Sequence, residues 1–498
     1  MVKVQKRMVH GLILLLLLFV ASQSHLWAGY ADLKSKRPNA SSLSSGQAKK
    51  PSQEWAAGQK KKDLRKKQSD TKPMPPLDEA PFCAQVPLMP VIREAKARLA
   101  KERVRYYPGS LGKPARRELK LALADFTTGK IEIISGIEEK KCLFLSDPKI
   151  RHAVNWWNGF NSSIDILEPA NTGIVGLLYA LDPKKKSWVR REAIIYTPYS
   201  NALLQPKLVE AGRQYLIEKI SQARKELHHA MFKAGSQMPL EKEPVFRDED
   251  YFNLILAEHT DPEAFRKIIA DQPTFDPDKR ERLRRLIYRI LVIIGANQED
   301  AYKFTGNYAS ARGLAQFTRI GMRVVWNRYT DADISRDFIE ATSNHLHSIK
   351  AEICLLDHYL ANVTGLYPNL AGSGYEKYAA GACYNGGPRN VLYGLKNFGV
   401  SWLHPHQRLL ELAGRASLNL KERRELEWLK KFRNHETFIY LNKMHAIESL
   451  QPSRNEDPIP PEQAHALTHE NVLTIGLQKP TVGNGNNPSF TNQVLKTE

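Results

Sequence analysis

One stretch of the sequence, residues 283–318, limits what this chain can fold into more than any other. Its first half carries apolar residues at helical spacing from Leu283 to Ile294, so this helix must bury one face. The helix runs into a single carboxylate, Glu299, and a loop leads on to the element Arg-Gly-Leu-Ala-Gln at 312–316. A partly desolvated carboxyl group has a raised pKa, which suits it to donating a proton near neutral pH. The alternative interpretation is that Glu299 is a solvated residue at a helix end.

Two later segments change the interpretation of this stretch. Residues 379–391 read AAGACYNGGPRNV, and residues 436–440 read ETFIY. With QED at 298–300 and ASARGLAQ at 309–316, they resemble the motif series of the catalytic domain of lytic transglycosylases of the soluble type. Each motif alone is weak, but four in the family's order are more specific. The resemblance covers roughly residues 280–448.

This resemblance implies a lysozyme-like helical domain over 246–448, with a long supporting helix at 338–363. It also implies cleavage of the β-1,4 bond between N-acetylmuramic acid and N-acetylglucosamine in peptidoglycan. Glu299 would protonate the leaving oxygen and then accept the proton of the muramic acid C6 hydroxyl as that oxygen attacks C1. Because the capture is intramolecular and leaves a 1,6-anhydro end, no second carboxylate is needed. No metal and no cofactor are implied.

Four residues are assigned to substrate binding by the same resemblance. Gln316 matches a glutamine that hydrogen-bonds the bound sugar, and Tyr384 matches a tyrosine whose hydroxyl lies near the acid. Asn385 and Tyr440 match residues beside the sugar cleft. Structural alternatives remain open, because Tyr384 and Asn385 also fit a helix-ending turn and Tyr440 also fits packing beneath the cleft.

The chain departs from the family pattern in three places. Asp300 follows Glu299 where serine is usual, so a hydroxyl contact to the acid is lost. Ala315 stands where methionine is usual, and the spacing from the glutamate to the glutamine is about one residue short. We expect Asp300 to raise the pKa of Glu299 if the two side chains approach. Two alternatives therefore stay open: a hydrolytic muramidase or chitinase-like lysozyme, and a non-catalytic glycan-binding scaffold of the envelope.

The two ends of the chain indicate export. Residues 1–31 combine a basic start, an apolar run and small residues, which is typical of a cleavable signal peptide, with an uncleaved anchor as the alternative. Residues 32–80 are a basic linker that we expect to be disordered, serving as a spacer or as a tether to an anionic surface. Residues 449–498 are a polar tail of the same kind. A periplasmic or cell-envelope location follows.

A net charge of +20 invites a nucleic-acid interpretation. The excess of Lys and Arg is partly concentrated in the linker, and no zinc-finger or RNP-type signature accompanies it. The expected partners are therefore peptidoglycan glycan strands and an anionic envelope surface, and no nucleic acid is expected.

Residues 81–245 form a globular region in which no family is recognised. Short apolar runs at 172–181 and 191–199 predict strands, and helical patterns at 90–105 and 207–232 predict helices. We therefore expect a mainly α chain, with a lysozyme-like helical C-terminal domain preceded by an unidentified α+β domain.

The four cysteines are Cys83, Cys142, Cys354 and Cys383. In an exported protein an even number indicates up to two disulfides. The pairings that respect the two domains are Cys83 with Cys142 and Cys354 with Cys383, the second supported by the closeness of these elements in the family. Their spacing fits no zinc site.

Overall fold

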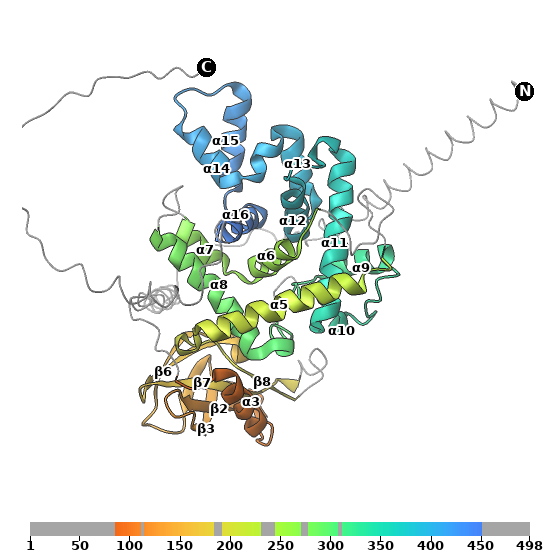
Figure 1. Cartoon of the computed structure of the whole chain (residues 1–498). Helices are drawn as coiled ribbons and strands as arrows, with labels where there is room; N and C mark the ends of the chain where they lie inside the picture. The colour runs from red at the N-terminus through yellow and green to blue at the C-terminus, as the bar shows by residue number, and fades with distance from the viewer. Residues whose placement is uncertain are drawn as a thin grey trace, which may run out of the picture. The chain divides into compact units, whose positions relative to one another are not determined.

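The computed structural model describes residues 85–110, 114–183, 192–230, 245–269, 277–306 and 311–450. The expected signal peptide, the basic linker, Cys83 and all but the first two residues of the polar tail lie outside these ranges. All described residues belong to one compact unit, Ala80–Glu498, which is mainly helical with a six-stranded antiparallel sheet and a separate two-stranded one (Figure 1). None of the helices within the described ranges has the length and apolarity needed to cross a bilayer.

The sheet has β2 at its centre, with β3 on one side and β7 on the other. β4 continues the sheet beyond β3, β8 continues it beyond β7, and all pairs are antiparallel. The strands of this sheet are β1 (Tyr106–Tyr107), β2 (Arg116–Asp125), β3 (Ile131–Glu139), β4 (Cys142–Leu145), β7 (Thr172–Ala180) and β8 (Ala193–Tyr196). Strands β5 (Arg151–Trp156) and β6 (Ser163–Glu168) form a separate antiparallel pair.

Apolar runs form the central strands because both faces of the sheet are covered there. In β2, Leu121 and Ala122 point to opposite faces and both are fully buried. Helix α3 (Leu88–Leu99) packs on β7 and β2 through Ala95 and Leu99. The predicted strands at 172–181 and 191–199 are confirmed as β7 and β8.

Helices build the rest of the described chain. The main ones are α5 (Pro206–Glu226), α6 (Asp248–His259), α7 (Pro262–Ile269), α8 (Pro277–Asn297), α9 (Arg319–Arg328), α10 (Phe338–Ser343), α11 (His345–Leu366), α12 (Glu376–Gly386), α13 (Pro388–Phe398), α14 (Pro405–Gly414), α15 (Leu420–Phe432) and α16 (Glu436–Glu448). Short 3-10 turns are η1 (Gly159–Asn161), η3 (Asn201–Leu203), η5 (Gln298–Asp300), η6 (Pro368–Leu370) and η7 (Val400–Leu403).

The helix predicted at 338–363 is divided in two. Asn344 has an extended backbone, and its side chain accepts hydrogen bonds from the backbone N–H groups of Leu346 and His347. This is an N-cap, so α10 ends and α11 begins there. The predicted helices at 90–105 and 207–232 correspond to α3 and α5.

Helices α5 and α8 cross with their backbones in direct contact. A Cβ on Gly212 of α5 would lie 2.0 Å from the Leu291 carbonyl oxygen, and one on Gly295 of α8 would lie 2.3 Å from the Leu208 carbonyl oxygen. Figure 1 shows the long α5 between the strands and the C-terminal helices. The crossing therefore brings the end of α8 close to the chain that leads out of the sheet.

Asn297, at the end of α8, joins three elements. It exchanges hydrogen bonds with the backbone of Thr197, accepting at 2.8 Å and donating at 2.9 Å. The ammonium of Lys96 on α3 donates to the Ala296 carbonyl at 2.8 Å and to Asn297 Oδ1 at 3.0 Å. One hydrophobic cluster runs from Leu88 to Ile447. The α+β region and the helical region, which the sequence suggested as two domains, thus share a core.

The predicted Cys354–Cys383 disulfide is wrong. Both thiols are free and fully buried, and Cys142 is a free thiol at the surface. Cys354 on α11 packs in the large core, whereas Cys383 on α12 packs in a second cluster with Trp402. The helices contact each other, but the two cysteines face different cores.

The α5–α8 crossing predicts an unusual response to alanine. Gly295→Ala is expected to lower the free energy of unfolding by about 2 kcal/mol, because the clash exceeds the roughly 1 kcal/mol gained in helix propensity. Gly365→Ala in α11 is the matched control, since no atom lies within 4 Å of its added Cβ. The control is expected to be neutral or slightly stabilising in urea denaturation. Equal effects of the two changes would contradict the close crossing.

Candidate active site

The structure separates Glu299 from the other predicted site residues. Glu299 is exposed on η5, and its Oε1 lies 2.6 Å from the ammonium of Lys219 on α5. Partial burial acts to raise the pKa of Glu299, but hydrogen bonds from Lys219 and Tyr215 and the Lys219 charge lower it overall. A carboxyl group with a lowered pKa is ionised at neutral pH and has no proton to donate.

Asp300 does not have the expected effect on its neighbour. Its Oδ1 lies 3.4 Å from the ammonium of Lys303. It is not among the groups that shift the pKa of Glu299, which is lowered rather than raised. Asp300 therefore pairs with a cation of its own, Lys303.

Another carboxylate, Glu258, lies among the remaining predicted residues. It occupies the last turn of α6, a helix that is buried on all sides from Tyr251 to Ala257. Its Oε1 is buried and has no hydrogen-bond partner among the described residues. Burial raises the pKa of Glu258 to about 7, although the charge of Lys443 and the hydroxyl of Tyr440 act in the opposite direction. The negative end of the helix dipole also disfavours the ionised form.

Three side chains from three other helices surround this carboxyl group. Glu352 on α11, Tyr384 on α12 and Tyr440 on α16 interact electrostatically with Glu258 and with one another. Tyr440 is only 2% exposed, so its ring packs beneath the site, as the structural alternative had it. Its hydroxyl faces Glu258 without forming a hydrogen bond of standard geometry. Tyr384 stays partly exposed.

The Gly-Leu-x-Gln motif forms a four-residue turn. Arg312 and Phe317 exchange two backbone hydrogen bonds, of 3.0 and 2.9 Å, that close the loop between them. Gly313 has φ +74°, and a Cβ there would lie 1.8 Å from the Thr342 carbonyl oxygen, so only glycine fits. Gln316 also has a positive φ, of 49°, and its amide donates back to the Gly313 carbonyl at 2.7 Å.

Two hydrogen bonds hold this turn against the Glu258 neighbourhood. The His259 ring, next in sequence to Glu258, contacts the Leu314 carbonyl oxygen through Nε2 at 2.6 Å. The hydroxyl of Tyr384 donates to the Ala315 carbonyl oxygen. The turn that carries Gln316 is therefore adjacent to the end of α6.

The two C-terminal motifs also come together. A Cβ on Gly386 would lie 2.0 Å from Thr437 Oγ1, so α12 and α16 cross closely where the two motifs meet. Asn385 is partly exposed on α12, and its Oδ1 is buried without a hydrogen-bond partner among the described residues. Gln316, Tyr384, Asn385 and Tyr440 thus belong to one neighbourhood, which also contains the carboxyl group of Glu258.

Sequence reasoning missed Glu258 because α7 and α8 lie between it and the turn. The glutamate nearest to Gly-Leu-x-Gln in the sequence is Glu299, but it is His259, the residue after Glu258, that contacts the turn. The signal that was present is the run Tyr-Phe-Asn-Leu-Ile-Leu-Ala at 251–257, which is too apolar for a surface helix and ends in a carboxylate.

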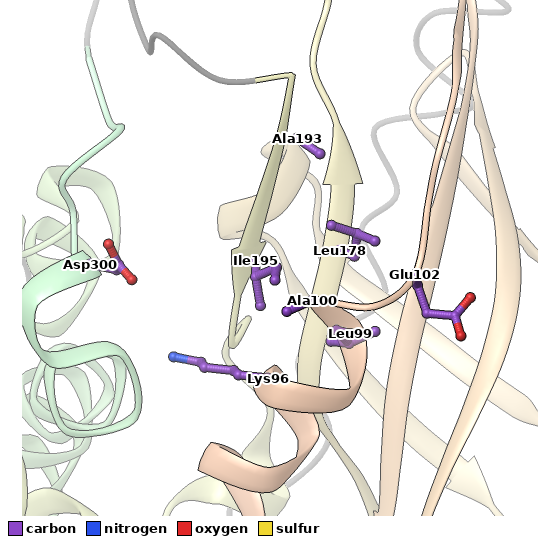
Figure 2. Close-up of a pocket in the computed structure, with 8 residues that line it drawn as sticks. All are labelled: Lys96, Leu99, Ala100, Glu102, Leu178, Ala193, Ile195 and Asp300. Atoms are coloured by element: carbon purple, nitrogen blue, oxygen red, sulfur yellow. The ribbon is translucent and has the colours of Figure 1, made fainter.

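A separate hollow of about 410 Å³ contains none of the predicted site residues. It is lined by Lys96, Leu99, Ala100, Glu102, Leu178, Ala193, Ile195 and Asp300 (Figure 2). Figure 2 shows Lys96 reaching from α3 toward the segment that carries Asp300. Burial lowers the pKa of Lys96 to about 8, with Asp300 acting in the opposite direction. Because its ammonium is bonded to the end of α8, we assign Lys96 a structural role.

Comparison with known proteins identifies no relative. No family model matches the chain, and no curated protein or solved structure matches it significantly. Within the described ranges, no three His, Cys, Asp or Glu side chains gather in a group that could hold a metal ion.

The two glutamates are expected to affect stability with opposite signs. The raised pKa of Glu258 contributes stability that is present below its unfolded value, near 4.5, and is lost as the pH rises through about 7. Glu258→Gln should therefore gain roughly 1–3 kcal/mol relative to wild type between pH 4 and pH 7.5.

Glu299→Gln is the matched control. The lowered pKa of Glu299 contributes stability above its unfolded value, and this is lost on acidification. The variant should lose less than about 1 kcal/mol at neutral pH, because the ion pair is solvent-exposed. Urea denaturation at several pH values measures both effects, and parallel curves for the two variants would contradict the assignment.

Proposed function

We propose that this protein is a lytic transglycosylase of peptidoglycan with Glu258, in place of Glu299, as its single catalytic carboxylate. The observation that carries the proposal is the position of Glu258, a partly exposed residue whose Oε1 is buried, beside Tyr384, Tyr440 and the turn that bears Gln316. The proposal includes a lysozyme-like arrangement of α6, α11, α12 and α16 and a location in the bacterial cell envelope.

The raised pKa of Glu258 fits the first chemical step. With a pKa of about 7, a substantial fraction of the protein carries the proton at neutral pH. Glu258 gives this proton to the glycosidic oxygen as the bond to C1 breaks, and the N-acetylglucosamine leaves as an alcohol. The sugar that remains develops positive charge at C1.

The second step returns the proton. The C6 hydroxyl oxygen of the muramic acid attacks C1, and its proton passes to the carboxylate of Glu258. One bond to C1 breaks and one forms, so the 1,6-anhydro product is obtained without added water. The nucleophile is part of the bound sugar, and proximity therefore replaces a second carboxylate.

Lys443 lies on α16 and supports both steps by bonding the C-terminal end of α6. Its ammonium donates to the carbonyl oxygens of Ala257, at 3.1 Å, and Thr260, at 2.5 Å. These bonds fix the helix end on which Glu258 stands. The same positive charge lowers the pKa of Glu258, so it stabilises the carboxylate formed in the first step.

Substrate contacts are assigned to the partly exposed polar groups. Asn385 has an unbonded Oδ1 within the described structure, and Gln316 can release its amide from the Gly313 carbonyl to bind a sugar. Hydrolysis through a second carboxylate is less well supported. Of the two neighbouring carboxyl groups, Glu352 on α11 is 0% exposed and cannot reach a sugar. Glu436 at the start of α16 is exposed and raises the pKa of Glu258, so it is the residue that hydrolysis would use as a second carboxylate.

Glu258→Gln tests the acid directly. The substitution keeps the size and removes the proton, so turnover of purified peptidoglycan should fall by roughly 10²–10⁴-fold. Glu299→Gln is the matched control and should retain activity, because that side chain is ionised and paired with Lys219. An active Glu258→Gln variant would refute the assignment.

Product mass decides the reaction type. Digestion by the wild-type protein should give fragments one water lighter than hydrolysis products. Ordinary reducing ends would identify a muramidase. If zymography detects no cleavage by the wild-type protein, the glycan-binding scaffold becomes the preferred function.

A further inference from the structure

Glu352 is a buried carboxyl group that the proposed chemistry does not use. It is 0% exposed on α11, and neither of its carboxyl oxygens has a hydrogen-bond partner among the described residues. Burial raises its pKa well above its usual range, and the neighbouring Glu258 raises it further. A fully buried carboxyl group with no bonded partner strongly favours its neutral form, so Glu352 presents an uncharged O–H donor.

The groups that face Glu352 come from three other helices. They are Glu258 on α6, Tyr384 on α12 and Tyr440 on α16. Two charged residues of α16 also act on Glu258: Lys443 lowers its pKa, and Glu436 raises it. Glu258 Oε1 and the Tyr440 hydroxyl are buried without hydrogen-bond partners in the described structure, as are both oxygens of Glu352. Buried polar atoms are nearly always bonded, so this gathering of unbonded ones requires a reason.

Two other polar groups near Glu258 already have hydrogen-bond partners. The His259 ring is bonded to the Leu314 carbonyl oxygen and stacked on Tyr302, with ring centroids 3.6 Å apart. The Tyr384 hydroxyl is bonded to the Ala315 carbonyl oxygen. Within the described cluster, Glu352 and Tyr440 are left to serve the Glu258 carboxyl group.

We propose that Glu352 is a positioning residue whose neutral carboxylic acid donates a hydrogen bond to the carboxylate that Glu258 becomes after protonating the leaving oxygen. This inference rests on the proposed function of Glu258. Because Glu352 is fully buried, it touches no substrate and acts only through Glu258. The structure shows no hydrogen bond between these two described residues, and the proposed bond forms when negative charge develops on Glu258 in its desolvated site, where a neighbouring donor has its largest effect. Glu352 keeps its own proton throughout, and the bond is lost when Glu258 recovers the C6 hydroxyl proton.

Two substitutions of Glu352 separate this role from a purely structural one. Glu352→Gln keeps a neutral donor of the same size, whereas Glu352→Leu removes the donor and keeps the bulk. The leucine variant should fold, because replacing an unbonded buried polar group by an apolar one is neutral or stabilising. Glu352→Met is a second apolar variant for the same comparison.

The first measurement is a carboxyl ¹³C NMR titration of the full chain labelled at glutamate. Loss of a signal in Glu258→Gln assigns Glu258. Its midpoint should stay unchanged in Glu352→Gln and rise by about one pH unit in Glu352→Leu and Glu352→Met, since a donor favours the charged form. An unchanged midpoint in both apolar variants overturns the proposal. A lower midpoint in Glu352→Gln also overturns it, because Glu352 would then be ionised and repel Glu258.

The second measurement is turnover of soluble peptidoglycan fragments. Glu352→Gln should stay within about threefold of wild type, while Glu352→Leu should lose roughly 10–100-fold in kcat with little change in KM. Equal losses in both variants overturn the proposal. The titration needs no substrate, so wild-type protein that fails to cleave peptidoglycan refutes the proposed function and leaves the coupling of the two glutamates to be decided by NMR.

Discussion

The desolvation of one carboxyl group at the C-terminal end of α6 is the constraint on which the helical region depends. Ionising Glu258 there places a negative charge in a low-dielectric site at the negative end of a helix dipole. The surrounding helices pack closely around that site: α12 and α16 cross at Gly386, and Tyr440 fills the space below, while Glu258 and Tyr384 stay partly exposed. Lys443 bonds the helix end itself. The contacts that pack these helices together therefore also influence the pKa of Glu258.

Much of the fold follows from local patterns in the sequence. Strands β7 and β8 and helices α3 and α5 were predictable, because the spacing of their apolar residues distinguishes a strand from a helix and those residues must be buried. The break at Asn344 was not predicted, since an N-cap inside a continuous apolar pattern is visible only when the hydrogen bonds of Asn344 are seen. The free thiols of Cys354 and Cys383 were also not predicted, because residues on two contacting helices can still face different cores.

The candidate site was predictable in part, for a related reason. Gln316, Tyr384, Asn385 and Tyr440 lie in one neighbourhood, but their order along the chain does not identify the carboxyl group that lies beside them. The apolar face of α8 was the reason for predicting Glu299 as the catalytic acid. That face is explained by the contact of α8 with α5 at Gly212 and Gly295. Helix α6 gives no amphipathic signal because it is buried on all sides. Distance along the sequence and distance in space diverge wherever a pair of helices is inserted between two parts of a site.

The bonds that Asn297 makes to Thr197 and Lys96 bear on how this protein can be divided. A fragment that starts at residue 246 would lose α5, which packs on α8 at Gly295. The face of α8 that contacts the α5 backbone would then be exposed to water. We therefore expect that the helical region does not fold as an independent domain without α5. A substitution on either side of the α5–α8 crossing is constrained by the backbone of the other helix.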